Sequence, residues 1–137
     1  MPPNPRHALI RQAYQAFTSR EVDRLKAIAS PDVEIYTVTG ELAERGEPYC
    51  GEAGLETYLT DVANVWDELE LTPAEFHDLD SERTLVLGRV LARRGTTLVD
   101  SPNAWLWTIR DERITRAEVF SDPESATALL RRGPEAD

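Results

Sequence analysis

Residues 100–121 read DSPNAWLWTIRDERITRAEVFS, and this stretch decides the fold of the chain. Aromatic and β-branched residues dominate it, which predicts two long strands joined by the tight polar turn Arg110–Arg113. Because side chains alternate between the two faces of a strand, Asn103, Trp105 and Trp107 share one face. Two tryptophans beside an amide are typical of a packed or ligand-lined interior. We therefore expect any pocket of this protein to lie on that face.

The segments outside this hairpin predict helices first and strands later. Apolar residues recur at helical spacing over residues 52–69 and alternate over 32–39. The full prediction is, in chain order, a helix starting at Asn4–Pro5, a shorter helix ending at Ser30–Pro31, a strand over 32–39, an exposed connection over 40–51, a helix over 52–69, strands over 74–79, 84–94, 97–109 and 114–121, and a helix opening at Asp122–Pro123. Strands that follow helices favour an α+β domain, in which a curved antiparallel sheet wraps over helices as a cone with an open mouth.

The composition limits the classes of partner. At 137 residues we expect a single domain over 1–137, with its core at about 8–130 and a frayed tail over 133–137. The formal net charge of −10 repels phosphate backbones and anionic lipids, and no apolar run approaches membrane-spanning length. We therefore expect neither nucleic acid nor a membrane as a partner. The chain opens on a polar sequence without a signal-peptide pattern, which predicts a cytoplasmic protein.

The common metal and cofactor signatures are missing from the sequence. Two histidines, His7 and His77, and the single cysteine Cys50 leave too few nitrogen and sulfur ligands for an ordinary zinc site. The motifs HExxH, CxxC, GxSxG, the P-loop and GxGxxG do not occur. We therefore expect no metal and no cofactor.

The order of the elements and several short motifs resemble the nuclear transport factor 2-like superfamily, and within it the SnoaL-like, polyketide cyclase-like branch. The motifs that carry the resemblance are Tyr14-Gln15-Ala16-Phe17, Pro31-Asp32-Val33-Glu34, Tyr49-x-Gly51-x-x-Gly54, Leu87-Gly88-Arg89-Val90, Asp100-Ser101-Pro102-x-Ala104-Trp105-x-Trp107 and Phe120-x-Asp122. The resemblance implies a cone-shaped, cystatin-like α+β roll, with a curved antiparallel or mixed sheet on the N-terminal helices. It does not imply one activity, because this fold hosts isomerases, dehydratases, cyclases, epoxide hydrolases and proteins that are not enzymes.

The ketosteroid isomerases of this superfamily have a carboxylate base and an oxyanion site. The position of the base matches Thr37, which cannot act as that base. The aspartate of the oxyanion site matches Asn103, whose amide can donate a hydrogen bond to a carbonyl oxygen without a raised pKa. The tyrosine of that site falls at or beside Ala13 and Tyr14. The resemblance thus implies half of an oxyanion site without its base.

Two further branches of the superfamily point to Arg89 and Val119. Limonene-epoxide-hydrolase-like proteins use an arginine and two aspartates, and the matching positions are Arg89, Leu91 and Val119. Polyketide cyclases keep an acid on the inner face of the last strand, where Val119 and Ser121 would lie. Only the arginine is retained, and it stands between Leu87 and Leu91. A guanidinium buried among leucines needs an acceptor, so a ligand oxygen, an internal carboxylate and a solvent-facing position all stay open.

We take Asn103, Arg89 and Tyr14 as the candidate catalytic residues. The candidate ligand-binding residues lie at positions expected to face inward, and they are Trp105, Thr37, Tyr58, Trp66 and Val119. Large aromatic side chains also fill protein cores and dimer interfaces, so core packing is the alternative for each of the aromatic candidates.

Two hypotheses about function follow. In the first, the protein binds a small hydrophobic molecule with a carbonyl or hydroxyl group and, if it is an enzyme, catalyses cofactor-free isomerisation, cyclisation or dehydration. In the second, it is a non-catalytic scaffold whose cone is packed shut. It then forms a homodimer through the outer face of the sheet, which would carry either Ala104, Leu106 and Thr108 or Glu118 and Phe120. An open pocket with several polar groups favours the first hypothesis. The sequence identifies neither the ligand nor the reaction.

Overall fold

The computed structural model describes residues 5–37, 48–120 and 128. Their elements in chain order are α1 (Pro5–Thr18), α2 (Val22–Ile28), β1 (Ala29–Tyr36), β2 (Tyr49–Cys50), α4 (Gly51–Val65), β3 (Glu68–Asp78), β4 (Arg83–Arg94), β5 (Thr97–Arg110) and β6 (Arg113–Phe120). The predicted helix at Asp122–Pro123, the tail over 133–137 and most of the connection over 40–51 lie outside the described residues. Among the described helices, none combines the length and the apolar character needed to cross a membrane.

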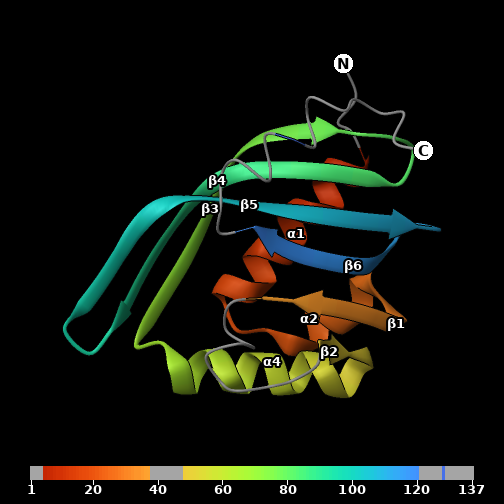
Figure 1. Cartoon of the computed structure of the whole chain (residues 1–137). Coiled ribbons are helices and arrows are strands. Elements are labelled where there is room, and N and C mark those ends of the chain that lie inside the picture. The colour runs from red at the N-terminus through yellow and green to blue at the C-terminus, as the bar shows by residue number, and fades with distance from the viewer. Residues whose placement is uncertain (1–4, 38–47, 121–127, 129–137) are drawn as a thin grey trace.

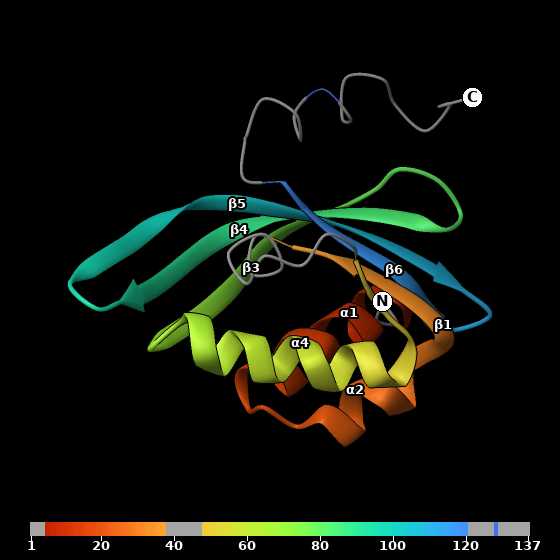
Figure 2. The same cartoon turned by 60° about the horizontal axis from the view of Figure 1, so that its bottom comes forward.

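One six-stranded sheet, in the order β2-β1-β6-β5-β4-β3, forms the body of the molecule. Neighbouring strands are antiparallel except β1 and β6, which are parallel. The described helices α1, α2 and α4 lie on the concave side of this curved sheet, as Figures 1 and 2 show from two directions. The predicted α+β cone with a mixed sheet is confirmed.

The predicted hairpin between β5 and β6 is present. Arg110 pairs with Arg113, so only Asp111 and Glu112 form the loop. Both have positive φ angles, of 51° and 62°, as a type I′ turn requires for a twist that matches the flanking strands. The register shifts by one residue between Thr108 and Ile109, and beyond this irregularity Trp105 faces Val119 across the ladder.

The main core fills the space between the helices and the concave face. The inward side chains of β5 include Trp105 and Trp107, whose rings stack with centroids 5.6 Å apart. Tyr14 of α1 meets the Trp107 ring edge-on at 5.5 Å. The helices also contribute Ile10 and Val62, which are fully buried. The alternation predicted for β5 therefore places its two tryptophans in the interior.

The outer face of the sheet carries a second, smaller apolar cluster. Leu85 is fully buried there, and Leu79 and Ala104 are nearly so. Partly buried Leu87, Leu106 and Phe120 pack against these three side chains. Apolar side chains consequently occupy both faces of β4 and β5.

The structure corrects the predicted boundary between the third helix and the sheet. We expected a helix over 52–69 and a strand over 74–79, but α4 ends at Val65 and β3 runs from Glu68 to Asp78. Leu69 fits the helical spacing, yet exposure alternates from Glu68 onward, which is the period of a strand. Pro73 is tolerated because β3 is the edge strand and its register shifts there.

The sheet bends sharply, and Gly88 permits the close approach of two strands near this bend. Figure 1 shows β3, β4 and β5 turning together. A Cβ atom on Gly88 would stand 2.1 Å from the Thr72 carbonyl oxygen and 3.1 Å from the Pro73 Cα. Gly88 also pairs with Asn103 on its other side. Only glycine therefore fits between β3 and β5 without displacing the β3 backbone.

Candidate functional site

A cavity of about 220 Å³ opens between the bent strands and the C-terminal half of α4. Its wall comes from the residue after β1, from helix α4 and the residue that follows it, and from strands β3, β4, β5 and β6. The lining residues are Thr37, Tyr58, Trp66, Leu69, Leu71, Val90, Ala92, Val99, Ser101, Pro102, Asn103, Trp105 and Val119. The bend of the sheet thus creates a pocket between β5 and α4 instead of a flat packed layer.

The polar groups of this cavity are neutral. Thr37 and Ser101 offer hydroxyls, and Asn103 offers an amide that can both donate and accept. Among the described lining residues there is no Asp, Glu, Lys, Arg or His. Nor do the described residues contain a group of three His, Cys, Asp or Glu side chains that could hold a metal ion. The cavity is suited to hydrogen bonding with an uncharged group.

The structure brings six of the candidate residues together around this cavity. They are Asn103 from the catalytic set and all five of the ligand-binding set, Trp105, Thr37, Tyr58, Trp66 and Val119. Their roles stay predictions, because their position alone does not show a bound molecule. Their convergence follows from strand alternation on β5 and β6 and from the inward stripe of α4.

Tyr14 lies in a different, deeper cavity of about 40 Å³, which Asn103 does not line. The expected pairing of Tyr14 with Asn103 around one oxygen atom is therefore not what the structure shows. Burial raises the pKa of the Tyr14 hydroxyl well above its ordinary value, and the neighbouring Trp107 indole opposes that rise only in part. Tyr14 is consequently a neutral hydroxyl at any ordinary pH.

The indole Nε1 atoms of the paired tryptophans, Trp105 and Trp107, are both buried. Neither Nε1 atom has an acceptor within hydrogen-bond geometry in the described part of the chain. Trp107 influences the Tyr14 hydroxyl through proximity, but the contact does not satisfy that geometry. A buried donor without an acceptor costs about 1–3 kcal/mol. Each indole therefore contributes apolar area to the core at the expense of an unsatisfied polar group.

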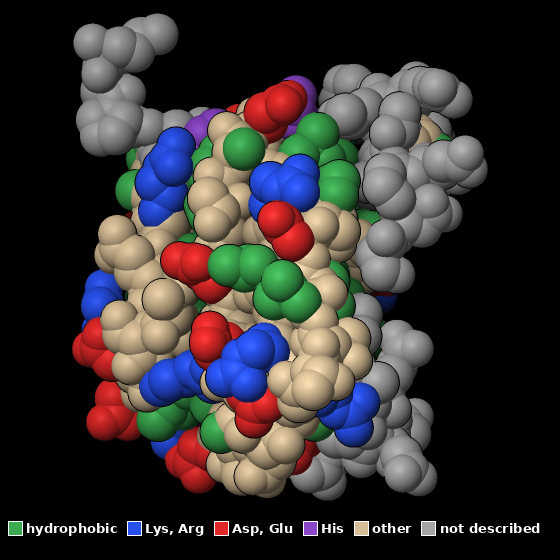
Figure 3. All heavy atoms as spheres, turned by 90° about the vertical axis from the view of Figure 1, so that its left-hand side faces the viewer, with side chains coloured by type: hydrophobic (Ala, Val, Ile, Leu, Met, Phe, Trp, Pro, Cys, Tyr) green, Lys and Arg blue, Asp and Glu red, His purple; other side chains and the backbone are tan. Residues whose placement is uncertain are grey.

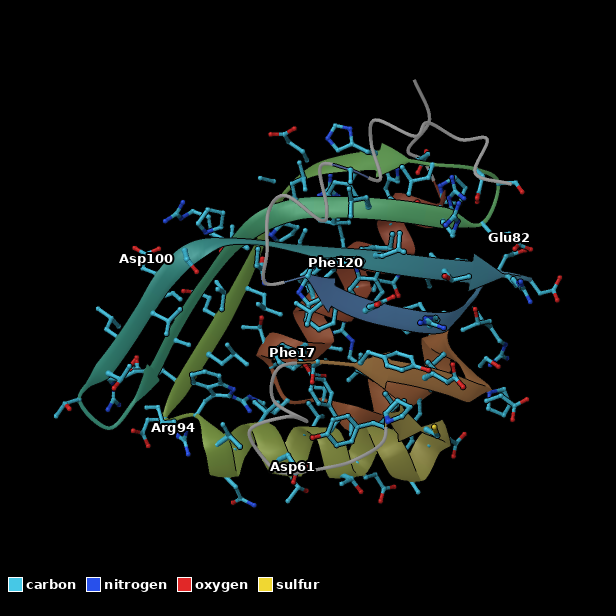
Figure 4. The ribbon with its side chains drawn as sticks, viewed as in Figure 1. Phe17, Asp61, Glu82, Arg94, Asp100 and Phe120 are labelled. Carbon is cyan, nitrogen blue, oxygen red and sulfur yellow. The ribbon has the colours of Figure 1, made fainter. Side chains whose placement is uncertain are left out.

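Arg89 lies outside the cavity, contrary to its place among the candidate catalytic residues. Its neighbour Gly88 pairs with inward-facing Asn103, so Arg89, one position on, projects from the outer face. Its Nη2 atom is 3.0 Å from the Asp100 Oδ1 atom, and both side chains are more than half exposed. Figure 3 shows mixed basic and acidic side chains on this side of the molecule, and Figure 4 places Asp100 on the outside of the bend. Of the three alternatives for Arg89, the structure shows two together: the guanidinium pairs with a carboxylate of the same chain, and it faces solvent.

Sequence reasoning missed Ser101 and a buried acid on α4. Ser101 lines the cavity two residues before Asn103, and the alternation of β5 would have been enough to find it. Asp61 is nearly fully buried, and its Oδ2 atom accepts a hydrogen bond of 2.6 Å from the Tyr49 hydroxyl. Figure 4 shows Asp61 on α4, and it lines neither cavity. This hydrogen bond ties α4 to the short strand β2.

Comparison with known proteins gives a family match and several similar structures. The family model described as "SnoaL-like domain" matches residues 10–117. A crystal structure of TerC, co-crystallised with polyporic acid, has a TM-score of 0.76 at 26% identity, and the match covers 93% of this chain and 99% of TerC. No curated protein matches the chain.

Two more distant structures share the fold. An NTF2-like protein from Burkholderia pseudomallei has a TM-score of 0.77 at 22% identity, with 98% of this chain and 100% of that chain covered. A protein from Xanthomonas campestris pv. campestris, which carries the provisional name polyketide cyclase, has a TM-score of 0.71 at 18% identity. The match covers 92% of this chain and 96% of that chain. These two likenesses support the cone-shaped fold alone.

Proposed function

The chain belongs to the SnoaL-like domain family, and from this premise we propose that it binds a small, uncharged, mostly apolar molecule with a carbonyl or hydroxyl oxygen. The observation that carries the proposal is the cavity of about 220 Å³, in which three neutral polar side chains interrupt an apolar wall. Such a combination of apolar lining and a few placed polar groups is typical of small-molecule sites. A cone packed shut by its aromatic residues would lack this space.

The size of the cavity sets the size of the ligand. An engineered apolar cavity of about 150 Å³ holds a benzene molecule, so about 220 Å³ accommodates one ring with a short substituent. Trp66 and Trp105 supply flat apolar surface for that ring. The Asn103 amide then donates to the ligand oxygen, which gives the molecule a fixed orientation.

The neutrality of the wall selects against anions. A carboxylate that enters the cavity loses its hydration and meets no cation among the described lining residues. The same neutrality limits the chemistry, because no carboxylate or imidazole in the described wall can remove a proton from carbon. We therefore place binding first, with polarisation of a carbonyl by Asn103 as the catalytic contribution of this site to an isomerisation, cyclisation or dehydration.

The test compares acetophenone with benzoate, two ligands of similar size that differ in charge, by isothermal titration calorimetry. Acetophenone binds the wild-type protein, and benzoate binds at least about tenfold more weakly. Asn103→Leu removes the donor at nearly constant volume and weakens acetophenone binding by about tenfold, since a lost hydrogen bond with a desolvated partner costs about 1–3 kcal/mol.

Arg89→Leu is the control, because Arg89 lies on the outer face and leaves the cavity unchanged. Equal affinity of the wild type and Asn103→Leu for acetophenone would show that Asn103 does not bind the ligand oxygen. Preference for benzoate would contradict the proposed selection for uncharged ligands.

A dimeric scaffold is the second candidate function, and the apolar cluster on the outer face is the observation that favours it. Leu87, Leu106 and Phe120 are only partly buried there. A second copy of the chain that pairs through this face would cover them. Sedimentation velocity at micromolar concentration tests the idea: a dimer that Leu106→Glu converts to a monomer supports it, and a wild-type monomer contradicts it.

A further inference from the structure

The large cavity and the small one adjoin each other across a partition of three side chains. Tyr58 of α4, Leu71 of β3 and Trp105 of β5 line both cavities. We call the cavity of about 220 Å³ the outer chamber and the cavity of about 40 Å³ the inner chamber. Both spaces are therefore bounded by these three side chains, and side chains rotate far more easily than backbone moves.

The inner chamber is lined almost entirely by carbon. Its wall comes from the base of the cone, and it consists of Ala13, Tyr14, Phe17, Leu25, Ala29, Val33, Ile35, Leu55, Tyr58, Leu71, Trp105, Trp107, Ile114 and Ala117. A void with such walls does not hold water well, because water needs two to four polar partners. An unfilled void also deprives its lining of contacts. The space is thus best filled by an apolar group of suitable size.

The volume of the inner chamber defines how large that group is. A space of about 40 Å³ takes about three water-sized spheres of 10–15 Å³ each, which corresponds to two or three carbon atoms. Small side chains, among them Ala13, Ala29 and Ala117, leave this room at the base of the cone. Larger residues at these positions would close the chamber.

We propose that the inner chamber is a second subsite, which receives a short alkyl substituent of the ligand held in the outer chamber. Leu71, together with Tyr58 and Trp105, sets the length of substituent that the protein accepts. This inference rests on the proposed function, because it assumes that an uncharged ring compound occupies the outer chamber. It adds a rule for ligand choice, namely an oxygen at the Asn103 end and two or three carbon atoms at the other.

The test uses acetophenone and its 4-methyl, 4-ethyl, 4-propyl and 4-butyl derivatives, which keep the carbonyl group constant. Burial of one methylene is worth about 0.8 kcal/mol, so each added carbon strengthens binding by about fourfold while the chamber has room. The dissociation constants of the wild type fall up to the ethyl or propyl derivative and rise again at butyl.

Two variants move this optimum in opposite directions. Ala117→Val adds two methyl groups to the inner chamber and fits a strand, so affinity no longer increases with alkyl length. Leu71→Ala widens the partition and shifts the optimum toward butyl. Ala74→Val, at an exposed position of β3, is the matched control and behaves like the wild type.

The outcomes separate this inference from the proposed function. If none of the ketones binds, the proposed function fails and the subsite fails with it. If acetophenone binds, but alkyl length has no effect or has the same effect in Ala117→Val, only the subsite is overturned. An optimum that shortens in Ala117→Val and lengthens in Leu71→Ala establishes the subsite.

Discussion

Replacement of Gly88 by alanine tests the close approach of β3 and β4 near the bend that forms the cavity. The new Cβ atom would stand 2.1 Å from the Thr72 carbonyl oxygen, more than 1 Å inside ordinary van der Waals contact, which begins at 3.4 Å. Both atoms belong to the backbone or are fixed to it, so rotation of a side chain cannot relieve the clash. Overpacking usually costs about 1–3 kcal/mol, and we expect the upper end, about 3 kcal/mol.

Urea denaturation, followed by circular dichroism, measures this loss in the free energy of unfolding. For 137 residues a loss of about 3 kcal/mol lowers Tm by about 10 °C. The matched control is Gly95→Ala in the turn between β4 and β5, where φ is +64° and nothing lies within 4 Å of the added atom. There only backbone strain remains, at about 1–2 kcal/mol. A Gly88→Ala protein as stable as the wild type, or more stable than Gly95→Ala, would refute the reasoning.

Two further predictions concern residues outside the cavity. Tyr49→Phe removes the 2.6 Å hydrogen bond to buried Asp61 and lowers the free energy of unfolding, measured by urea denaturation, by about 2 kcal/mol. An unchanged free energy of unfolding would mean that the hydrogen bond is dispensable. Partial burial alone would raise the pKa of Asp78, but hydrogen bonds from Thr84 and His7 and the charge of Arg6 outweigh it and hold that pKa below its usual value. Stability from this carboxylate is therefore present above about pH 3.9 and is lost as pH falls through the lowered pKa. The difference in free energy of unfolding between the wild type and Asp78→Asn consequently shrinks in acid. A difference that does not depend on pH would contradict this.

The parts of the fold that could be predicted from sequence are those with strong local signals. Trp105 and Trp107 at alternate positions indicated the inward face of β5, and the polar residues Asp111 and Glu112 marked the turn to β6. These signals also account for the position of Asn103 in the cavity. In each case the local pattern and the tertiary packing favour the same structure.

The errors arose where a local pattern was compatible with two structures. Leu69 extends the helical spacing of α4, yet it belongs to edge strand β3, where Pro73 is tolerated. Apolar residues on both faces of β4 concealed which face was inward, so the sequence left open whether Arg89 meets a ligand, a carboxylate or solvent. In the structure it pairs with Asp100 on the outer face. Which face is concave depends on the packing of helices distant in sequence, and no single strand encodes it.

The partition of the interior into two chambers lay beyond sequence reasoning. It depends on the simultaneous placement of Tyr58, Leu71 and Trp105, which come from three elements. Tyr14 and Asn103, which resemblance alone would pair, consequently line different chambers.

The central claim is that a small uncharged molecule binds in the outer chamber, and the three indole N–H signals in a ¹H–¹⁵N spectrum test it most directly. All three tryptophans of the chain line a chamber: Trp66 the outer, Trp107 the inner and Trp105 both. During titration with acetophenone, the account predicts that the signals of Trp66 and Trp105 shift in a saturable manner and that Asn103→Leu weakens the saturation. Indole signals that stay unchanged at saturating ketone would contradict the account.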